Sequence, residues 1–239
     1  RGPCSINIRS FIMNVGKIPE NALKRSILNQ IKHRRKEVLL GPGVGEDCSV
    51  IALDQDEVLV MSTDPITGTV KDIGTLAVHI TANDIASSGA EVIGIMLTIL
   101  LPEGTTEEEL KNLMQDMESV CSELNIEIVG GHTEVTKAVN QPIVTVTGVG
   151  KTKRENVIKT AGAVPGQEIV MTKWAGLEGT AIIASEKEEE LKMKYPASFI
   201  EGAKKMIDYI SIVPEAMVAR EVGAASMHDV TEGGIFGAL

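Results

Sequence analysis

The stretch DIGTLAVHITANDIASSGA, residues 72–90, precedes an apolar run over residues 92–101. Apolar side chains recur in the first part at the spacing of one helix face, at Ile73, Leu76, Ala77 and Ile80. This periodicity predicts a helix, and Gly89 is a typical residue to end it. The run that follows is apolar along its length and predicts a buried strand. A helix joined directly to a buried strand indicates a domain that mixes both kinds of element.

Further elements are predicted on both sides of this unit. Helical patterns cover residues 19–32 and 105–125, the latter with a threonine cap and glutamates in its first turn. Strand patterns cover 48–53 and 58–63, read as a hairpin, and then 126–131 and 142–150. After a polar linker at 151–163, two more strands are predicted at 167–174 and 225–229, with small helices between them.

This order predicts an α+β fold in two parts. We expect residues 1–16 to be a tag or a disordered arm and residues 17–160 to be an N-terminal domain. Residues 161–239 would be an α/β C-terminal domain. Two strand signals are too few to close a sheet there, so this domain is expected to be incomplete.

The composition limits what the protein can bind. Lys and Arg number 23 and Asp and Glu number 33, so the net charge is −10, and aromatic residues are only 3%. Such a chain is poorly suited to nucleic acid. Its three cysteines have no C-x-x-C spacing, which favours a reducing, cytoplasmic compartment. No apolar run is long enough to span a bilayer.

Two glycine-rich stretches fail as phosphate-binding motifs. GPGVGED, residues 41–47, has Glu46 where the dinucleotide fingerprint needs glycine. GVGKT, residues 148–152, has Thr145 where a Walker loop needs glycine, and that threonine lies in a predicted strand. A nucleotide site would therefore have to use other residues.

Five acids lie at the ends of predicted strands or on the inward face of the helix: Asp47, Asp64, Asp84, Glu134 and Asp229. Two carboxylates about 4 Å apart repel by roughly 4 kcal/mol at an effective dielectric constant of 20, so a converging cluster needs a cation. Ligands that are all oxygen select Mg²⁺ or Ca²⁺, and carboxylate-held Mg²⁺ commonly binds substrate phosphates.

Each of these acids also has a structural interpretation. Asp47 and Asp64 could be turn residues, Asp84 could pair with a lysine or cap backbone, and Glu134 could be solvated. His79 is expected to be a partly buried structural histidine. His132 and His228 are stronger candidates for a site, because each lies beside glycine and acid at a strand end.

Five motifs, GVGEDCSVI, STDPITG, NDIASSGAE, GGHTEV and HDVTEGG, follow one another in this order. Together they resemble the aminoimidazole ribonucleotide (AIR) synthetase superfamily, which includes hydrogenase-maturation protein E, thiamine-monophosphate kinase and selenophosphate synthetase. The resemblance covers residues 17–239, and the stretch TEVTKAVNQPIV, residues 133–144, is most similar to the hydrogenase-maturation-like branch.

The resemblance implies a ferredoxin-like N-terminal domain that forms a β-barrel across a homodimer, followed by an α/β domain. It implies ATP and Mg²⁺ between the domains without a Walker loop, and a chain that continues for about another hundred residues. The implied activity transfers the terminal phosphoryl group of ATP to a substrate oxygen. The substrate would be a small molecule or a peptide terminus, activated as an amide-like group. A thiamine-monophosphate-type kinase and a non-catalytic nucleotide-binding module are the alternatives.

The resemblance also implies roles for individual residues. The metal ligands would be Asp47, Asp64, Asp84, Glu134 and Asp229, and the catalytic residues would be Asp84, His132 and Asp229. The nucleotide would contact Gly43, Gly45, Thr63, Asn83, Gly130, Gly131 and Thr133. The chain departs from several members at His132, where they carry an acid, and Glu134 would substitute as a ligand.

Overall fold

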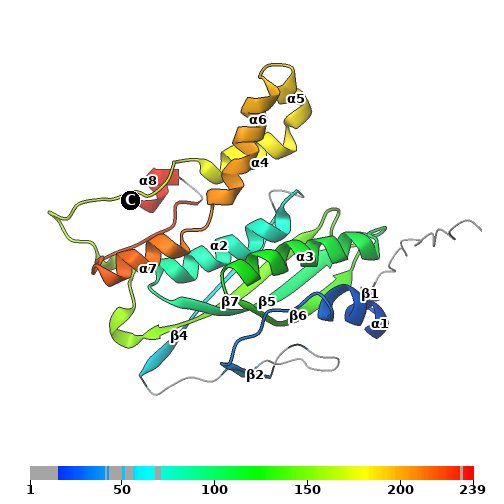
Figure 1. Ribbon diagram of the computed structural model, residues 1–239, viewed down its shortest axis with the longest axis horizontal. Helices are drawn as coiled ribbons and strands as arrows, with labels where there is room; N and C mark the ends of the chain where they lie inside the picture. The colour runs from blue at the N-terminus through cyan, green and yellow to red at the C-terminus, as the bar shows by residue number, and fades with distance from the viewer. Residues whose placement is uncertain (1–15, 41, 43–49, 52–55, 68–70, 232–233) are drawn as a thin grey trace, which may run out of the picture.

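The computed structural model describes residues 16–40, 42, 50–51, 56–67, 71–231 and 234–239. Its N-terminal part is built on one sheet with the strand order β1-β6-β5-β7-β4 (Figure 1). The strands are β1 (Gly16–Lys17), β4 (Glu57–Ile66), β5 (Glu91–Leu101), β6 (Glu127–Val135) and β7 (Ile143–Lys153). Strands β5 and β6 are parallel, and the other neighbours pair antiparallel.

Two helices cover one face of this sheet (Figure 1). Helix α2 (Ile73–Ser87) connects β4 to β5, and helix α3 (Glu107–Glu123) connects β5 to β6. Both connections join strands that run in the same direction and both proceed along the sheet in the same sense. Because such crossovers are right-handed, the two helices must lie on the same side. The core between them and the sheet is aliphatic, with Val78, Ile85, Ile95, Leu110 and Met114 fully buried.

The two central helices and the central strand are confirmed. Gly89 has φ of +78° after the end of α2. Thr106 caps α3 in a reciprocal box, in which its hydroxyl accepts from the Glu109 amide and its own amide donates to the Glu109 carboxylate. Apolar periodicity, a threonine cap and a terminal glycine are local features of the sequence, and they predicted these elements correctly.

The predicted hairpin between residues 48–53 and 58–63 is wrong. Strand β4 pairs instead with β7, ten residues against ten from Glu57↔Lys153 to Ile66↔Val144. Strand β3 (Val50–Ile51) pairs with β2 (Val38–Leu40) in a separate ladder. The first helix is also shorter than expected, with α1 (Glu20–Leu23) followed by a π-helical turn, η1 (Lys24–Leu28).

The α+β class is confirmed, but the ferredoxin-like order is not what the chain has. A ferredoxin-like domain runs β-α-β-β-α-β, whereas this one runs β4-α2-β5-α3-β6-β7. The second face of the sheet has neither central helix on it. On that face the side chains of Leu59 and Met61 are 44% and 62% exposed.

The regular elements that the structure describes in the second part of the chain are all helices or 3-10 turns. After two 3-10 turns, η2 (Arg154–Asn156) and η3 (Thr160–Gly162), it contains α4 (Leu177–Glu186), α5 (Glu188–Lys192), α6 (Ala197–Lys204), η4 (Lys205–Tyr209), α7 (Val213–Glu221) and α8 (Gly234–Ala238). The small helices are as expected, but the strands predicted at 167–174 and 225–229 are not formed. A β-rich segment becomes a strand only beside a pairing partner, and no described segment pairs with either one.

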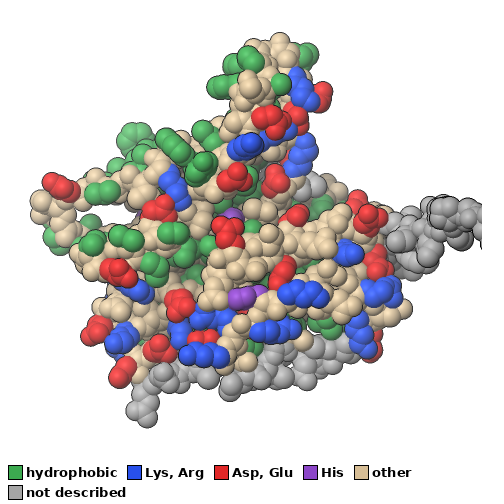
Figure 2. All heavy atoms as spheres, viewed as in Figure 1, with side chains coloured by type: hydrophobic (Ala, Val, Ile, Leu, Met, Phe, Trp, Pro, Cys, Tyr) green, Lys and Arg blue, Asp and Glu red, His purple; other side chains and the backbone are tan. Residues whose placement is uncertain are grey.

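None of the described helices is long and apolar enough to cross a membrane. Figure 2 shows acidic and basic side chains interspersed over the face it presents, with hydrophobic side chains gathered on its left. Several of the exposed apolar side chains belong to the extended segment before α4 and to α7, among them Ile169, Val170, Trp174 and Val218.

Candidate functional site

Asp64 and Asp84 meet between β4 and α2. Residues alternate in exposure along β4, and the side chains at even positions are the less exposed ones, facing α2. Asp64 is one of these. Asp84 lies one helical turn before the end of α2, four residues after Ile80, and both acids are half-buried. The Ser62 hydroxyl is 2.6 Å from Asp84 Oδ2 and 3.5 Å from Asp64 Oδ2, so one serine hydroxyl lies between two carboxylates.

The electrostatics of this pair are those expected of two acids with one partner. Burial, together with the hydrogen bond and the charge of Asp84, raises the pKa of Asp64 to about 6, against the opposing effect of Ser62. A carboxyl group with this pKa holds a proton at mildly acidic pH unless a cation replaces it. The pair could therefore supply two carboxylate ligands to a cation.

Ser62 was not among the predicted site residues. Its signal in the sequence is its position two residues before Asp64 in a predicted strand, which places both side chains on the same face. Pro65 lies within the same strand although it has no backbone N–H to donate. It is tolerated there because β4 lies at the edge of the sheet.

Asn83 and His79 lie on a different face of α2, toward the second part of the chain. The Asn83 amide donates to the Ile210 carbonyl at 2.9 Å and accepts from the Ile212 amide at 2.8 Å. Asn83 is only 6% exposed, so its polar atoms are used by the chain itself. His79 is buried, and burial and the charge of Lys173 lower its pKa to about 4. His79 is thus the buried histidine expected, although its Nδ1 has no hydrogen-bond partner.

His132 and Glu134 lie on the opposite face of the sheet from the acid pair. Asp64 is in register with Val146, and Val146 with Leu97, both buried toward the helices. His132 is instead paired with Thr98, whose side chain points away from the helices and is exposed. His132 Nε2 is 3.2 Å from Glu134 Oε2. Within one chain, His132 and Glu134 are therefore close to each other but are separated from the acid pair by the sheet.

Gly130 and Gly131 lie inside β6, at a β-bulge, rather than in a turn. The register with β5 shifts between Ile95 and Met96. Gly131 has φ of +152°, and a Cβ there would be 2.0 Å from the Leu97 carbonyl oxygen. Gly130 has room, since a Cβ would meet only the Met96 side chain at 4.0 Å. Thr133, two residues on, is buried.

Thr63 lies beside Asp64 on β4 but points to the open face. Its hydroxyl is 2.8 Å from that of Thr147 on β7. Of the predicted nucleotide contacts, Thr63 and Gly130 are therefore on the open side of the sheet, while Thr133 is buried. Gly43, Gly45 and Asp47 lie outside the described residues.

Asp229 is buried in the extended segment after α7, with 7% of its surface exposed. His228 Nδ1 is 3.3 Å from Asp229 Oδ1, and Oδ2 has no hydrogen-bond partner among the residues that the structure describes. A buried carboxylate oxygen without a hydrogen bond is costly, so this atom is a candidate ligand for a cation or a donor. Among the described residues, no group of three or more His, Cys, Asp or Glu side chains could hold a metal ion by itself.

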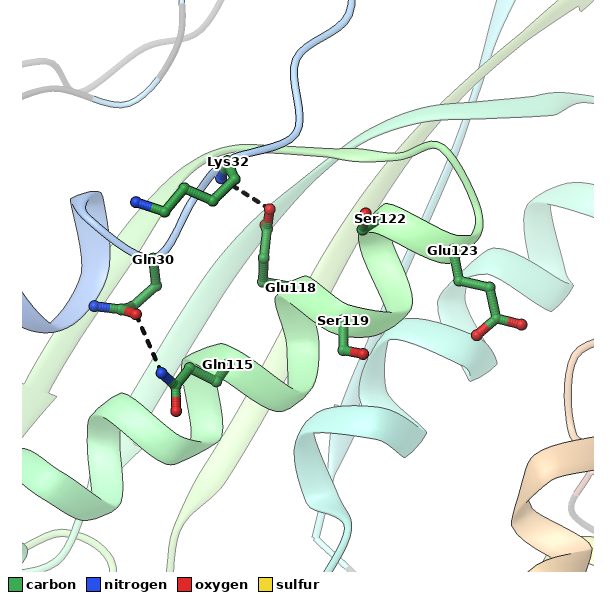
Figure 3. A pocket seen from close by; sticks show the side chains of 7 residues that line it. All are labelled: Gln30, Lys32, Gln115, Glu118, Ser119, Ser122 and Glu123. Carbon is green, nitrogen blue, oxygen red and sulfur yellow. Dashed lines mark hydrogen bonds between the residues drawn. The ribbon is translucent and has the colours of Figure 1, made fainter.

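A cavity of about 630 Å³ lies away from all of these residues, between α3 and the segment after η1 (Figure 3). Glu118 lies in its wall and accepts from the backbone amides of Lys32 and His33 at 2.8 and 2.9 Å. Gln115 and Gln30 join the same two segments. These contacts attach the N-terminal segment to α3, so the cavity is a structural junction.

Comparison with known proteins gives two family matches. The model described as "AIR synthase related protein, N-terminal domain" matches residues 45–152. The model described as "AIR synthase related protein, C-terminal domain" matches residues 164–239. The boundary between the two matches falls in the polar segment that follows β7.

Three of the curated relatives are 25% to 30% identical to this chain over the aligned residues. A putative hydrogenase expression/formation protein of Methanocaldococcus jannaschii is 25% identical over 228 residues, 94% of this chain and 66% of the relative. Carbamoyl dehydratase HypE of Cupriavidus necator is 29% identical over 74% of this chain and 52% of its own length. Thiamine-monophosphate kinase of Methanospirillum hungatei is 30% identical over 79% of this chain and 61% of its own length.

Solved structures have the same fold. A hydrogenase maturation protein HypE matches with a TM-score of 0.70 and 25% identity over 93% of this chain and 65% of the other. HypE in complex with ATP matches with a TM-score of 0.61 and 26% identity over 71% of this chain and 50% of the other. The chain spans between half and two thirds of the length of these relatives.

Proposed function

Because the chain belongs to the AIR synthase-related superfamily, we propose that it is an ATP- and Mg²⁺-dependent enzyme that transfers the terminal phosphoryl group of ATP to a substrate oxygen. The observation that carries the proposal is the Asp64–Asp84 pair with Ser62 between the two carboxylates. ATP in the similar HypE structure supports it.

The acid pair fits a hard divalent cation. Burial and Asp84 raise the proton affinity of Asp64, so a cation can take the place of that proton, and oxygen donors are what Mg²⁺ prefers. Asp64 and Asp84 would hold the ion, which when bound neutralises charge on the nucleotide phosphates. The contribution of the protein is to position the phosphates and stabilise the charge that develops during transfer.

The other predicted site residues keep their roles as proposals. Asp229 would complete the ligand set from the second part of the chain, since its buried Oδ2 lacks a partner. Asp47, Gly43 and Gly45 would act from the glycine-rich segment. Asn83 has its amide committed to the backbone of Ile210 and Ile212, so any effect of Asn83 on the nucleotide would be indirect.

The residues on the open face of the sheet require a second copy of the chain. His132, Glu134, Thr63 and Gly130 point away from the acid pair of their own chain, on the face with exposed Leu59 and Met61. We propose that this face forms a homodimer interface, so that these residues act next to the partner's site. An exposed apolar patch with a polar row beside it supports an interface.

The phosphoryl acceptor has two candidates. An amide-like oxygen, as in a carbamoyl dehydratase, is supported by the similarity to HypE. A phosphate acceptor is supported by the thiamine-monophosphate kinase relative at 30% identity. In the first case the phosphorylated group is a leaving group, and in the second it is the product.

The first test is a thermal unfolding series with ATP, with Mg²⁺, and with both. We expect ATP to raise the unfolding temperature only when Mg²⁺ is present, because binding to the folded state alone stabilises it. Equal unfolding temperatures in all conditions would contradict the proposal. Phosphate release with carboxamide acceptors or with thiamine monophosphate then separates the two reactions, and binding without turnover would favour a non-catalytic module.

A further inference from the structure

A buried amide is one of the contacts between the two parts of the chain. Asn83 extends from α2 in the N-terminal part and makes two hydrogen bonds to the backbone of residues 210–212. Its amide nitrogen donates to the Ile210 carbonyl, and its amide oxygen accepts from the Ile212 amide. A side-chain amide donates through its nitrogen and accepts through its oxygen, so one residue makes both contacts. Replacing it with a carboxylate would keep the shape and turn the donor into a second acceptor.

The same segment is held from its other side. Lys173 donates to the Ser211 carbonyl, which lies between the two residues that Asn83 contacts, and forms an ion pair with Glu215 at 2.9 Å. Glu215 is in the first turn of α7. Consequently the start of α7 is fastened to α2 through Asn83 and to the segment before α4 through Lys173.

The end of α7 is fastened to α2 as well. Arg220 donates to the Gly89 carbonyl just beyond the end of α2, where a cation is favourable for the helix dipole. Helix α7 therefore lies along the second half of α2, pinned near both of its ends (Figure 1). The chain then continues into the extended segment that carries Asp229, eight residues after α7 ends at 221.

We infer that Asn83 is a positioning residue for nucleotide binding, which fixes residues 210–212, and with them the start of α7, against the helix that carries Asp84. Asn83 is the neighbour of Asp84 in the sequence. One turn of α2 therefore carries both a proposed metal ligand and the amide that docks the segment leading, through α7, to Asp229. This inference rests on the proposed Mg²⁺–ATP site at Asp64 and Asp84. The amide itself contacts backbone and not the nucleotide.

The test compares Asn83→Asp with the matched control Asn112→Asp, an exposed helical position on α3 that makes no contact with the second part. Docking is followed through Trp174, the only tryptophan in the sequence, which packs edge-on against Tyr209 with 5.6 Å between ring centroids. Both rings adjoin the fastened segment, so the near-ultraviolet circular dichroism of the full chain reports its order. Mg²⁺–ATP affinity is measured by calorimetry on the same samples.

We expect Asn83→Asp to keep its far-ultraviolet spectrum, lose most of the Trp174 signal, and bind Mg²⁺–ATP about tenfold more weakly, as for loss of a buried hydrogen-bond pair. Asn112→Asp should match the wild type in all three. If Asn83→Asp loses the Trp174 signal but keeps full affinity, the amide is structural only and the inference is overturned. Unchanged Trp174 signal overturns it as well.

Two further measurements cover the remaining outcomes. If Asn83→Asp does not fold, Asn83→Ala is used, with hydrogen exchange of the Ile212 amide as the readout: faster exchange at Ile212 together with weaker Mg²⁺–ATP binding supports the inference, and unchanged exchange overturns it. If the wild type binds no Mg²⁺–ATP, the proposed function fails and the positioning role fails with it, while the Trp174 and Ile212 readouts still establish whether Asn83 docks the two parts.

Discussion

At the scale of single residues, the acid pair is where sequence pattern and structure agree most closely. Asp84 continues the apolar stripe of α2 and was expected to face inward, whereas Asp64 was expected at the end of a strand. The structure places them together, with Ser62 between. The reason is that helix and strand periodicities fix the side of an element from which a residue points.

Replacing Asp84 with asparagine is expected to remove most Mg²⁺-dependent nucleotide binding. The substitution keeps the size and the hydrogen bond to Ser62 but removes the charge that holds the cation. Calorimetry with ATP in the presence and absence of Mg²⁺ measures the effect. The control is Asp208→Asn, an exposed carboxylate of the second part. If Asp84→Asn binds like the wild type, Asp84 is structural.

His79 predicts how stability depends on pH. Its pKa is about 4 in the folded chain, against a usual value near 6.5, because burial and Lys173 disfavour the charged form. Between these values the unfolded chain binds more protons than the folded chain, so the free energy of unfolding rises with pH. The contribution of His79 to stability is lost as pH falls through this window. The loss is at most about 3 kcal/mol. Denaturant titrations from pH 4 to 7 should show a steeper dependence for the wild type than for His79→Gln.

At the scale of elements, strand β6 is longer than its sequence indicates. The expected strand ended at Gly131, but the observed one continues through a β-bulge to Val135. As a result His132 and Glu134 are strand residues with a defined face, and that face is the open one. Only glycine fits at position 131, whereas position 130 has space.

The two glycines of β6 should respond differently to alanine. Gly131→Ala places a Cβ 2.0 Å from the Leu97 carbonyl oxygen at φ of +152°, and is expected to cost about 3 kcal/mol of unfolding free energy. Gly130→Ala should cost less than about 1 kcal/mol, since its Cβ meets nothing closer than 4.0 Å. Urea unfolding of both variants makes the comparison. Similar losses would show that the bulge relaxes.

At the scale of the whole molecule, two features remain open in the described chain. One face of the main sheet is uncovered, and the extended segment before α4 is exposed, with Ile169 and Val170 at 77% and 81%. Both crossover helices lie on the same side because both connections proceed in the same sense along the sheet. The topology therefore leaves the open face for a partner, and we propose a second copy.

The substitution Met61→Asp should separate that dimer. Met61 is 62% exposed, so a carboxylate there costs the single chain little, but two copies would bury it in an apolar interface. Sedimentation equilibrium should give a dimer for the wild type and a monomer for the variant, with equal unfolding temperatures for the isolated chains. Ile183→Asp, on the exposed side of α4, is the control and should remain dimeric. A wild-type monomer at high concentration would contradict the interface.

The sequence by itself determined the elements that carry local signals: α2 with its glycine end, α3 with its threonine cap, the buried strand between them, and the inward direction of Asp84. Only the tertiary structure decided that β4 pairs with β7 instead of β3, that His132 points away from the acid pair, and that Asn83 hydrogen-bonds residues 210–212. The physical reason is that periodicity is a property of a few neighbouring residues. Strand partners, register and inter-domain hydrogen bonds depend instead on residues many positions apart, and a shift of one residue in register reverses the face of every side chain.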